Sequence, residues 1–426
     1  MQIHVVKPGQ TLWFIGREYG VSPGLLARFN GLSEPYRLAV GQSLLILKPA
    51  ALYTVQPGDT VFQISQRFSL GKNELYRLNP NLAAQERLYP GQVLVTALEE
   101  RPGREIETMG YAYPWVNEGV LRGILPYAGY LAPFTYGFTE QGELVEPDDA
   151  AMLALAKTFG VQTLLHLSTL TEQGNFSAQR AGQMLENAQA RERLIANTVR
   201  IMQEKGFAGV DVDFEFLGRA LAEPYAAFLN ELSSSVHVAG GFLMAALAPK
   251  TSDDQPGVLY EGHDYARVGQ AVDQVLLMTY EWGYTYGPPM AVAPVNAVRR
   301  VVEYALGRIP AEKILLGFPN YAYDWTLPYE AGLTRATVIG NETAPQLAFD
   351  TGSEILYDET SQTPWFTYTG MDGAVHEVWF EDARSSAAKF RLIEEYGLRG
   401  IGYWNFMRPF TANFSLLNAE FQINQE

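Results

Sequence analysis

The residues best suited to chemistry are three acidic residues at alternate positions, Asp211, Asp213 and Glu215, in an otherwise apolar run. Side chains alternate across a β-strand, so the three carboxyl groups would point to one face and Val212 and Phe214 to the other. Carboxylates held this close repel one another, and the repulsion raises the pKa of at least one of them. A carboxyl group that keeps its proton near neutral pH can act as a general acid.

The acidic run is also compatible with a metal site or a solvated surface strand. Consecutive acids on one face can hold magnesium or calcium, so a divalent metal site stays open as an alternative. A solvated strand is disfavoured because Val, Phe and Leu surround the acids. The chain has no Cys, and its five His include no close pair on one helical face. Thiol catalysis, disulfides and Cys-ligated zinc are therefore excluded, and we expect no metal and no cofactor.

The acidic run needs a scaffold, and the chain beyond residue 105 alternates short apolar runs with helical patterns. Eight parallel strands in about 320 residues indicate an α/β fold, a closed (β/α)8 barrel. Catalytic side chains of this fold lie at the C-terminal ends of the strands, which makes Glu215 the best placed proton donor. A long gap before the last strand, from about 327 to 378, predicts a small β-containing insertion that walls one side of the cleft. The predicted strands are Glu107–Tyr113, Leu131–Phe138, Val161–Ser168, Gly209–Phe216, Phe242–Pro249, Gln274–Trp282, Ile314–Tyr323 and Arg399–Met407.

The N-terminal part of the chain contains two copies of one pattern at a constant offset. The copies begin at His4 (HVVKPGQTLWFIGREYG) and Tyr53 (YTVQPGDTVFQISQRFS), and each closes with a Gly-Gln pair and an apolar strand. Thr11 and Thr60 follow a Pro-Gly turn and are typical N-caps, so each copy predicts a strand, two helices and a returning strand. Apolar periodicity lapses over residues 98–105, which marks a domain boundary. We predict three domains: the first repeat at 1–49, the second at 50–98 and the barrel at 105–426.

Charge and hydropathy exclude two classes of partner. The formal net charge of -16 leaves no basic stripe for a phosphate backbone, so we expect no nucleic-acid partner. Apolar runs fall short of the roughly 20 residues of a membrane span. The opening MQIHVVKPGQ lacks the basic and apolar regions of a signal peptide. Aromatic residues make up 12% of the chain, and Tyr and Trp suit the apolar faces and polar edges of sugar rings.

The two copies resemble the LysM module over residues 1–98, through the V-x-P-G-[DQ]-T opening and the closing Gly-Gln pair. The resemblance implies binding of N-acetylglucosamine-containing glycans, chitin or peptidoglycan, by two loops beside the helices. These loops are 8–12 and 37–41 in the first copy and 57–61 and 87–91 in the second. The same loop residues also serve the turn and the helix cap, while two weak sites on one chain would gain avidity for a repetitive polymer. The implied glycan contacts are Pro8, Gly9, Thr11, Pro57, Gly58 and Thr60.

The run from Ala208 to Glu215 resembles the D-G-x-D-x-D-x-E motif of glycoside hydrolase family 18, and the resemblance extends over residues 105–426. Two positions depart from the family pattern. Ala208 stands where the motif has Asp, and the third strand has His166-Leu167-Ser168-Thr169 in place of the Ser-x-Gly-Gly typical of chitinases. Supporting matches are Met278-Thr279-Tyr280, Gly317-Phe318-Pro319 with Tyr321, and Tyr403-Trp404.

The family resemblance implies a retaining, substrate-assisted hydrolysis. Glu215 would protonate the glycosidic oxygen while the 2-acetamido carbonyl of the substrate attacks the anomeric carbon. Water would then open the oxazolinium ion with Glu215 as base. Asp213 would orient the acetamido N–H, Asp211 beneath it would share its proton, and Tyr280 would donate to the acetamido oxygen.

Further residues are expected at the substrate. Trp404 would form the floor under the distorted sugar, with packing in the barrel core as the alternative. Glu281 and Trp282 follow the sixth-strand motif directly and are expected to contact substrate. Sugar contact and packing at the rim are equally open for Tyr111, Tyr321, Asp324 and Trp325.

The twin repeats and the runs 323–325 and 380–385 look like the branch of peptidoglycan N-acetylglucosaminidases from endospore-forming bacteria. This resemblance implies spore cortex peptidoglycan as the substrate and the spore coat, cortex or cell wall, outside the cytoplasm, as the location. Two alternatives stay open: a chitinase or chitooligosaccharide hydrolase of the same mechanism, and a spore coat protein that binds glycan without activity. The retained Glu215, Asp213 and Tyr280 argue against the inactive protein.

Overall fold

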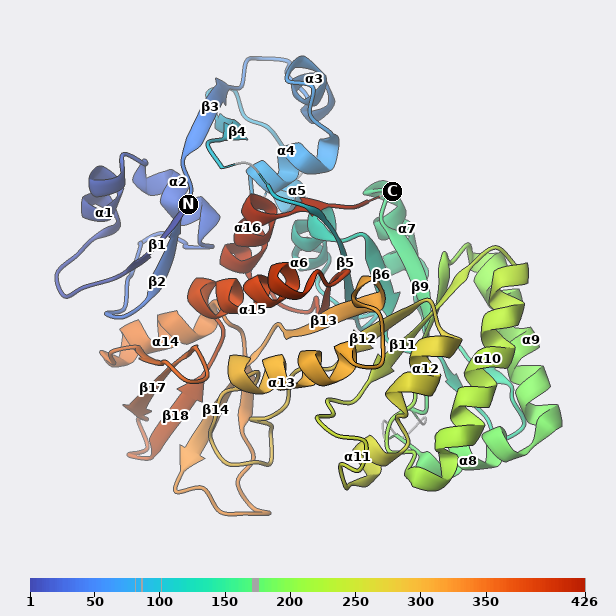
Figure 1. Ribbon diagram of the computed structural model, residues 1–426. Helices are drawn as coiled ribbons and strands as arrows, with labels where there is room; N and C mark the ends of the chain where they lie inside the picture. The colour runs from blue at the N-terminus through green and yellow to red at the C-terminus, as the bar shows by residue number, and fades with distance from the viewer. Residues whose placement is uncertain (81, 86, 101, 171–175, 426) are drawn as a thin grey trace.

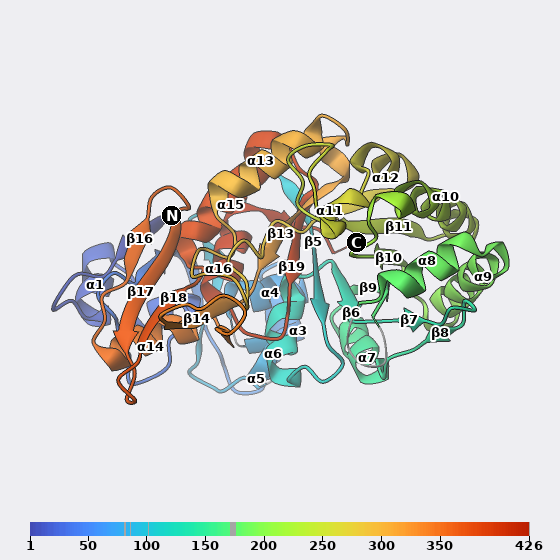
Figure 2. The same ribbon diagram turned by 90° about the horizontal axis from the view of Figure 1, so that it is seen from below.

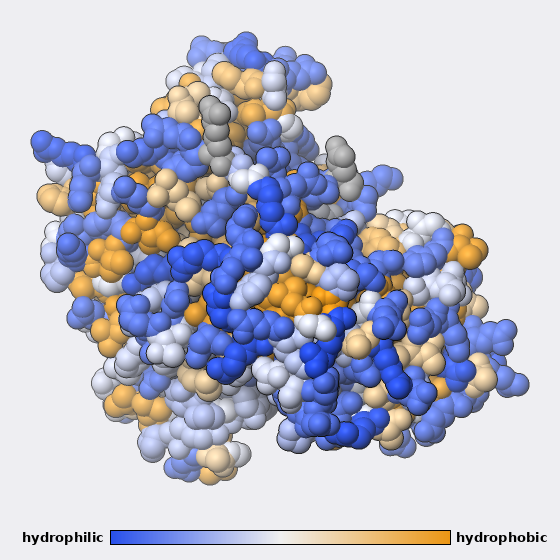
Figure 3. All heavy atoms as spheres, in the orientation of Figure 1, coloured by the Kyte–Doolittle hydropathy of each residue, from blue (hydrophilic) through white to orange (hydrophobic). Residues whose placement is uncertain are grey.

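The computed structural model describes the whole chain except residues 81, 86, 101, 171–175 and 426. Two small N-terminal modules, drawn in blue in Figure 1, lie beside a barrel that carries a separate small sheet, drawn in orange. In the described part of the chain no helix is both long and apolar enough to cross a bilayer. The face seen in Figure 3 is largely hydrophilic, with apolar residues in separate patches.

Each N-terminal module pairs its first and last strands in antiparallel fashion around its helices. The first helix begins at a Thr side chain in both modules: Thr11 accepts the Phe14 N–H, and Thr60 accepts the Gln63 N–H. The second module adds a short third helix, which the expected strand-helix-helix-strand pattern lacks. The elements are β1 Gln2–Val5, α1 Leu12–Tyr19, α2 Pro23–Phe29 and β2 Ser43–Ile46, then β3 Pro49–Thr54, α3 Val61–Arg67, α4 Lys72–Leu78, α5 Leu82–Gln85 and β4 Val93–Leu98.

A buried Asn ties the second helix of each module to its returning strand. Asn30 Nδ2 donates to the carbonyls of Leu26 and Leu45, and the Leu45 N–H donates back to Asn30 Oδ1 at 2.7 Å. Asn79 makes the same three bonds with Leu75 and Val95. A buried amide with every polar atom paired stabilises a module whose apolar core is thin.

The predicted closed barrel is confirmed: eight parallel strands pair in sequence order, and the last pairs with the first. A short ninth strand, β20 Gln422–Ile423, extends the sheet at the N-terminal end of β5. The barrel strands are β5 Glu105–Ala112, β6 Tyr130–Pro133, β9 Gln162–Ser168, β10 Gly209–Asp213, β11 Phe242–Leu247, β12 Gln274–Leu277, β13 Ile314–Pro319 and β19 Gly400–Trp404.

Helices surround the barrel, as the view in Figure 2 shows. A two-stranded hairpin, β7 Gly137–Phe138 with β8 Leu144–Val145, projects after β6. The helices are α6 Glu118–Ile124, α7 Ala150–Thr158, α8 Ala178–Glu186, α9 Ala188–Lys205, α10 Ala222–Val238, α11 Val258–Glu261, α12 Tyr265–Ala271, α13 Val295–Leu306, α15 Ala383–Tyr396 and α16 Thr411–Glu420.

The insertion between β13 and β19 is a five-stranded antiparallel sheet covered by one helix. It begins at Ala322, because the seventh apolar run contains two strands and not one. The chain turns at Asn320, whose N–H donates to the Trp404 carbonyl and whose Nδ2 donates to the carbonyls of Asn405 and Arg408. Its elements are β14 Ala322–Leu327, β15 Thr337–Ile339, α14 Thr343–Thr351, β16 Leu356–Asp358, β17 Thr363–Thr369 and β18 Val375–Trp379.

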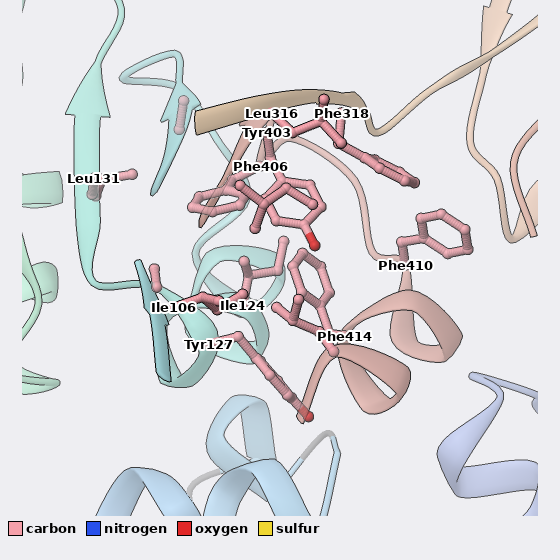
Figure 4. Close-up of a cluster of buried hydrophobic side chains, with 14 of the residues drawn as sticks. Ile106, Ile124, Tyr127, Leu131, Leu316, Phe318, Tyr403, Phe406, Phe410 and Phe414 are labelled. Carbon is pink, nitrogen blue, oxygen red and sulfur yellow. The ribbon is translucent and has the colours of Figure 1, made fainter. Parts of the chain in front are cut away.

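An aromatic cluster fills the space between the barrel and α16 (Figure 4). Tyr403 on β19 points into this cluster, where its ring lies 5.1 Å from that of Phe414 and its hydroxyl donates to Asn413. Tyr127 continues the cluster, 5.3 Å from Phe414. Because side chains alternate along β19, a Tyr403 that faces outward leaves Trp404 facing the mouth of the barrel.

Both modules are docked on the barrel. Arg77 of α4 donates to Asn418 and to the carbonyl of Pro126, and its burial lowers the pKa of its guanidinium. In the first module Gly41 is buried against the insertion, and a Cβ placed there would lie 1.9 Å from the Ile355 carbonyl oxygen. The corresponding Gly91 of the second module is exposed. The two modules therefore present different loops to solvent.

Candidate active site

The acidic run lies at the C-terminal end of β10, in the register that strand alternation predicts. Asp211 is fully buried inside the barrel, Asp213 ends the strand, and Glu215 follows it at the mouth, half-buried. Phe214 points the other way, and its ring stacks 5.6 Å from that of Phe228 on α10. The strand stops three residues earlier than expected because the chain turns at Phe216, which has a φ of 59°.

A cleft of about 770 Å3 opens at this end of the barrel. Asp213 and Glu215 lie in its wall, while Asp211 lies beneath it. The other expected residues in the wall are Tyr111, Tyr280, Glu281, Trp282 and Trp404.

Burial and mutual repulsion favour the protonated forms of the two cleft acids. Burial raises the pKa of Asp213 to about 6, with Asp211 adding to the rise and His166 opposing it. Burial also raises the pKa of Glu215 well above its usual value, and the charges of Asp213 and Glu281 raise it further. Both effects favour the protonated carboxyl of Glu215, the form that a general acid requires.

Tyr280 stands beside the two acids because of a tight arrangement after β12. The Thr279 hydroxyl donates to the Gly317 carbonyl at 2.8 Å, and a Cβ at Gly317 would lie 2.9 Å from the Tyr280 ring. The glycine of the seventh strand is therefore needed for the close approach. Burial and the charge of Asp213 raise the pKa of Tyr280 well above 10, so its hydroxyl remains a hydrogen-bond donor.

Glu281 reaches into the cleft from a backbone with a φ of 67°. Its carboxylate accepts a hydrogen bond from the Tyr321 hydroxyl and another from the Tyr323 hydroxyl at 3.1 Å. Desolvation raises the pKa of Glu281, and the two tyrosine hydrogen bonds oppose the rise. Tyr321 is 3% exposed and lies outside the cleft wall. Its contact with the site is the hydrogen bond to Glu281.

Trp404 lies in the cleft wall among other aromatic rings, with its centroid 4.8 Å from that of Phe134 and 5.6 Å from that of Tyr111. Trp282, whose backbone N–H donates to the Val292 carbonyl, is half-buried in the same wall. Flat apolar rings next to carboxylates provide the surface that a sugar needs.

The structure separates Asp324 and Trp325 from the cleft. Both belong to β14 of the insertion. Asp324 accepts hydrogen bonds from Tyr368 and His376, at 2.7 and 2.9 Å. Trp325 is fully buried, and its Nε1 donates to the Gly287 carbonyl. Asp324 is therefore bonded within the insertion, Trp325 joins the insertion to the loop after β12, and neither residue lies in the cleft wall.

Sequence reasoning missed His166, Tyr113 and Trp115. His166 is fully buried on β9, and its Nδ1 lies 2.7 Å from Asp211 Oδ2. Its signals in the sequence are its inward position on the third predicted strand and its place at the start of the run that replaces the Ser-x-Gly-Gly pattern. Trp115 is 73% exposed in the cleft wall and stacks on Tyr113 at 4.5 Å. Its signal is its place just after the first strand, at the catalytic end of the barrel.

The loop residues of the two modules lie where the turn and cap require them. Gly9 and Gly58 have φ values of 78° and 87°, and Pro8 and Pro57 are exposed beside them. Large exposed aromatic side chains that sequence reasoning did not select, Trp13 and Phe62, follow the two capping residues, Thr11 and Thr60. Over the described residues, no group of three or more His, Cys, Asp and Glu side chains is arranged to hold a metal ion.

Comparison with known proteins agrees with this geometry. The model of glycosyl hydrolases family 18 matches residues 107–408, and the LysM domain model matches residues 4–47 and 53–96. The chain is 39% identical to the cortical fragment-lytic enzyme of Bacillus subtilis, over 99% of each chain. It is 32% identical, over 100% of both chains, to the putative sporulation-specific glycosylase YdhD of the same organism.

The solved structures include a full-length match. The crystal structure of the Bacillus megaterium spore cortex-lytic enzyme SleL has a TM-score of 0.84 and 35% identity, and the match covers 100% of this chain and 99% of that one. The likeness therefore includes both modules and the insertion as well as the barrel. The chain belongs to glycosyl hydrolases family 18, carries two LysM domains, and is a glycoside hydrolase.

Proposed function

We propose that the enzyme hydrolyses spore cortex peptidoglycan after N-acetylglucosamine, with retention of configuration and with the substrate's acetamido group as the nucleophile. One observation carries the proposal: Asp213, Glu215 and Tyr280 meet in one aromatic-lined cleft, with the pKa of Glu215 raised. The names of the full-length relatives support cortex as the polymer. The proposed site of action lies outside the cytoplasm, at the cortex or cell wall.

Each of the three groups has its own part in this mechanism. Glu215 gives its proton to the glycosidic oxygen, and later takes a proton from the water that opens the oxazolinium ion. Asp213 accepts the acetamido N–H and stabilises the positive ring. Tyr280 donates to the acetamido oxygen, where charge changes during attack. Trp404 supports the distorted sugar from below.

Glycan binding by the N-terminal modules forms the second part of the proposal. The second module exposes both its turn at Gly58 and its loop at Gly91. In the first module only the turn at Gly9 is open, because Gly41 is covered by the insertion. We therefore assign tighter polymer binding to the second module. Removal of the exposed Phe62 ring should weaken sedimentation with insoluble peptidoglycan more than removal of Trp13.

The test is the release of muropeptides from purified cortex, followed by chromatography. Replacement of Glu215 by Gln removes a general acid and should lower the rate by about 10²- to 10⁴-fold. Glu420→Gln is the matched control, because Glu420 is half-buried on α16 outside the cleft. If the Glu215→Gln variant digests cortex as fast as the wild type, the assignment of Glu215 as the general acid is wrong.

Two further arms of the experiment separate the alternatives. If chitin oligomers are cleaved faster than cortex, the enzyme is a chitinase or chitooligosaccharide hydrolase of the same mechanism. If the wild-type chain binds cortex and releases no muropeptide, it is an inactive binding protein. The anomer first formed, read by NMR, tests the mechanism: an inverted product contradicts substrate assistance.

A further inference from the structure

The two inner acids of the run, Asp211 and Asp213, are buried close together. None of the catalytic groups Asp213, Glu215 and Tyr280 carries a positive charge that would stabilise them in the ionised form. Asp211 and Asp213 are 0% and 6% exposed and lie on one face of one strand. An ionised carboxylate in such a place is costly unless a cation or hydrogen-bond donors face it. The groups that face this volume determine whether Asp213 can be ionised when the acetamido N–H arrives.

His166 is the basic group in contact with both acids. It lies beside Asp211 in the register of β9 and β10. Its Nδ1 is 2.7 Å from Asp211 Oδ2, and its Nε2 is 3.9 Å from Asp213 Oδ2. The ring is fully buried between Phe134, stacked at 4.9 Å, and the edge of Tyr111, also at 4.9 Å.

The remaining groups around His166 leave its second nitrogen directed at the acids. Phe134, directly after β6, is apolar, and Tyr111 on β5 and Tyr280 after β12 are neutral, because burial raises the pKa of both tyrosines well above 10. Among the described residues, His166 Nε2, the Tyr111 hydroxyl, Asp211 Oδ1 and Asp213 Oδ1 are buried without a hydrogen-bond partner, and the nearby charge of Asp211 contributes to the raised pKa of Tyr111. His166 Nε2 and Asp213 Oδ2 lie 3.9 Å apart, which is ion-pair distance.

We propose that His166 is the buried counter-cation of the acid run and a positioning residue for Asp213, with one imidazole N–H on Asp211 and the other beneath Asp213. This inference rests on the proposed function of the cleft. It replaces the expected sharing of one proton between Asp211 and Asp213 with an ion pair between Asp211 and His166. The lowering effect of His166 on the pKa of Asp213 agrees with this role.

The consequence for catalysis concerns the outer acid. With Asp211 paired to His166, Asp213 is free to be ionised and to accept the acetamido N–H with its outer oxygen. The Ser-x-Gly-Gly pattern of chitinases has Ser where this chain has His166. A hydroxyl can bond to Asp211 but brings no charge, so the pH dependence of this enzyme should differ from that of a variant with a neutral donor.

The test compares pH profiles of kcat/KM for soluble cortex fragments. His166→Asn keeps an N–H donor near Asp211 and loses the charge. An opposite charge within ~4–6 Å shifts a carboxyl pKa by about 1–3. The acid limb, which the Asp213 pKa of about 6 leads us to expect near pH 6 in the wild type, should therefore move up by at least about one pH unit. Activity at pH 6 should then fall about 10-fold or more, with a smaller loss at higher pH. An unchanged acid limb would overturn the proposal.

The matched control is His376→Gln. His376 is also paired with an aspartate, Asp324 at 2.9 Å, but lies in the insertion away from the cleft. Its loss should leave the acid limb unchanged. If His376→Gln shifts the acid limb as far as His166→Asn does, the shift comes from the change in overall charge and not from the contact with Asp213. That result would overturn the proposal.

A second measurement needs no substitution at His166. The ¹⁵N NMR spectrum of histidine-labelled wild-type enzyme reports whether each imidazole carries one proton or two, and variants of the other four histidines assign the signals of His166. A doubly protonated ring at pH 6 is expected, and a neutral ring down to pH 5 would contradict it. If the wild-type chain is inactive on cortex, the proposed function fails and the NMR result still decides the state of His166. If the wild type is active, Glu215→Gln is inactive and His166→Asn leaves the acid limb unmoved, the proposed function holds and only the inference about His166 fails.

Discussion

Replacement of Asp213 by Asn should stabilise the fold while it removes activity. Burial raises the pKa of this carboxyl from 3.8 to about 6. The folded state therefore binds the Asp213 proton more tightly than the unfolded state does. The stability from this proton is fully present below pH 3.8 and is lost as the pH rises through about 6. Above pH 6 the ionised, buried carboxylate opposes folding.

The size of the effect follows from the pKa difference. A difference of about two between folded and unfolded states corresponds to about 3 kcal/mol at pH 7.5 and about 1 kcal/mol at pH 4.5. An isosteric amide removes this cost. The 107–408 segment that matches the family would unfold with an entropy of about 0.6 kcal/mol per kelvin. The unfolding temperature of Asp213→Asn should then rise by up to about 5 °C at pH 7.5.

The assay is thermal unfolding of wild type and variant at several pH values between 4.5 and 8. The gain should shrink as the pH falls. Asp324→Asn is the matched control, because this buried carboxylate accepts hydrogen bonds from Tyr368 and His376 and its loss should destabilise the fold by about 1–3 kcal/mol. An Asp213→Asn protein that is no more stable than wild type, or whose gain is independent of pH, would refute the electrostatic reasoning.

Three other substitutions test separate contacts. The charge of Glu281 raises the pKa of Glu215, so Glu281→Gln should lower that pKa and move the alkaline limb of kcat/KM to lower pH; an unmoved limb contradicts this. Tyr280→Phe removes a donor to the reacting acetamido oxygen, and steady-state assays should show a loss of about 10²- to 10³-fold in kcat with the unfolding temperature retained. Lys389→Met breaks a fully buried ion pair with Glu381 at 2.8 Å and should cost about 3–5 kcal/mol in denaturant unfolding. The double variant with Glu381→Gln should recover part of that loss, and strictly additive effects would contradict the pairing.

The barrel and the acid run could be predicted because their signals are local. Each strand is a short apolar run, and the alternation of Asp211, Asp213 and Glu215 follows from the geometry of a single strand. The strand ends were the main error. Apolar residues continue past the last hydrogen-bonded pair, as Phe214 does after β10 and Phe406 after β19, because they pack around the mouth of the barrel.

The missed parts of the site depend on which strands are neighbours. His166 lies 45 positions before Asp211 in the chain, and only the pairing of β9 with β10 brings them together. Glu281 and Tyr321 were both expected at the site, but their contact across 40 positions depends on the pairing of β12 with β13. A single sequence shows the residue types on each strand. The register between strands decides which charged and polar side chains lie in contact.

The two LysM modules also show what a sequence pattern cannot predict. Their motifs match, but the structure places the matching residues in different surroundings. Gly41 and Gly91 hold the same place in the pattern, yet Gly41 is buried under the insertion and Gly91 is open to solvent. The contacts of Arg77 with Asn418 and Pro126 also hold the second module against the barrel. Two glycan sites formed by these loops would therefore differ in their access to a polymer. A polymer strand held by the second module would reach the cleft from one fixed direction.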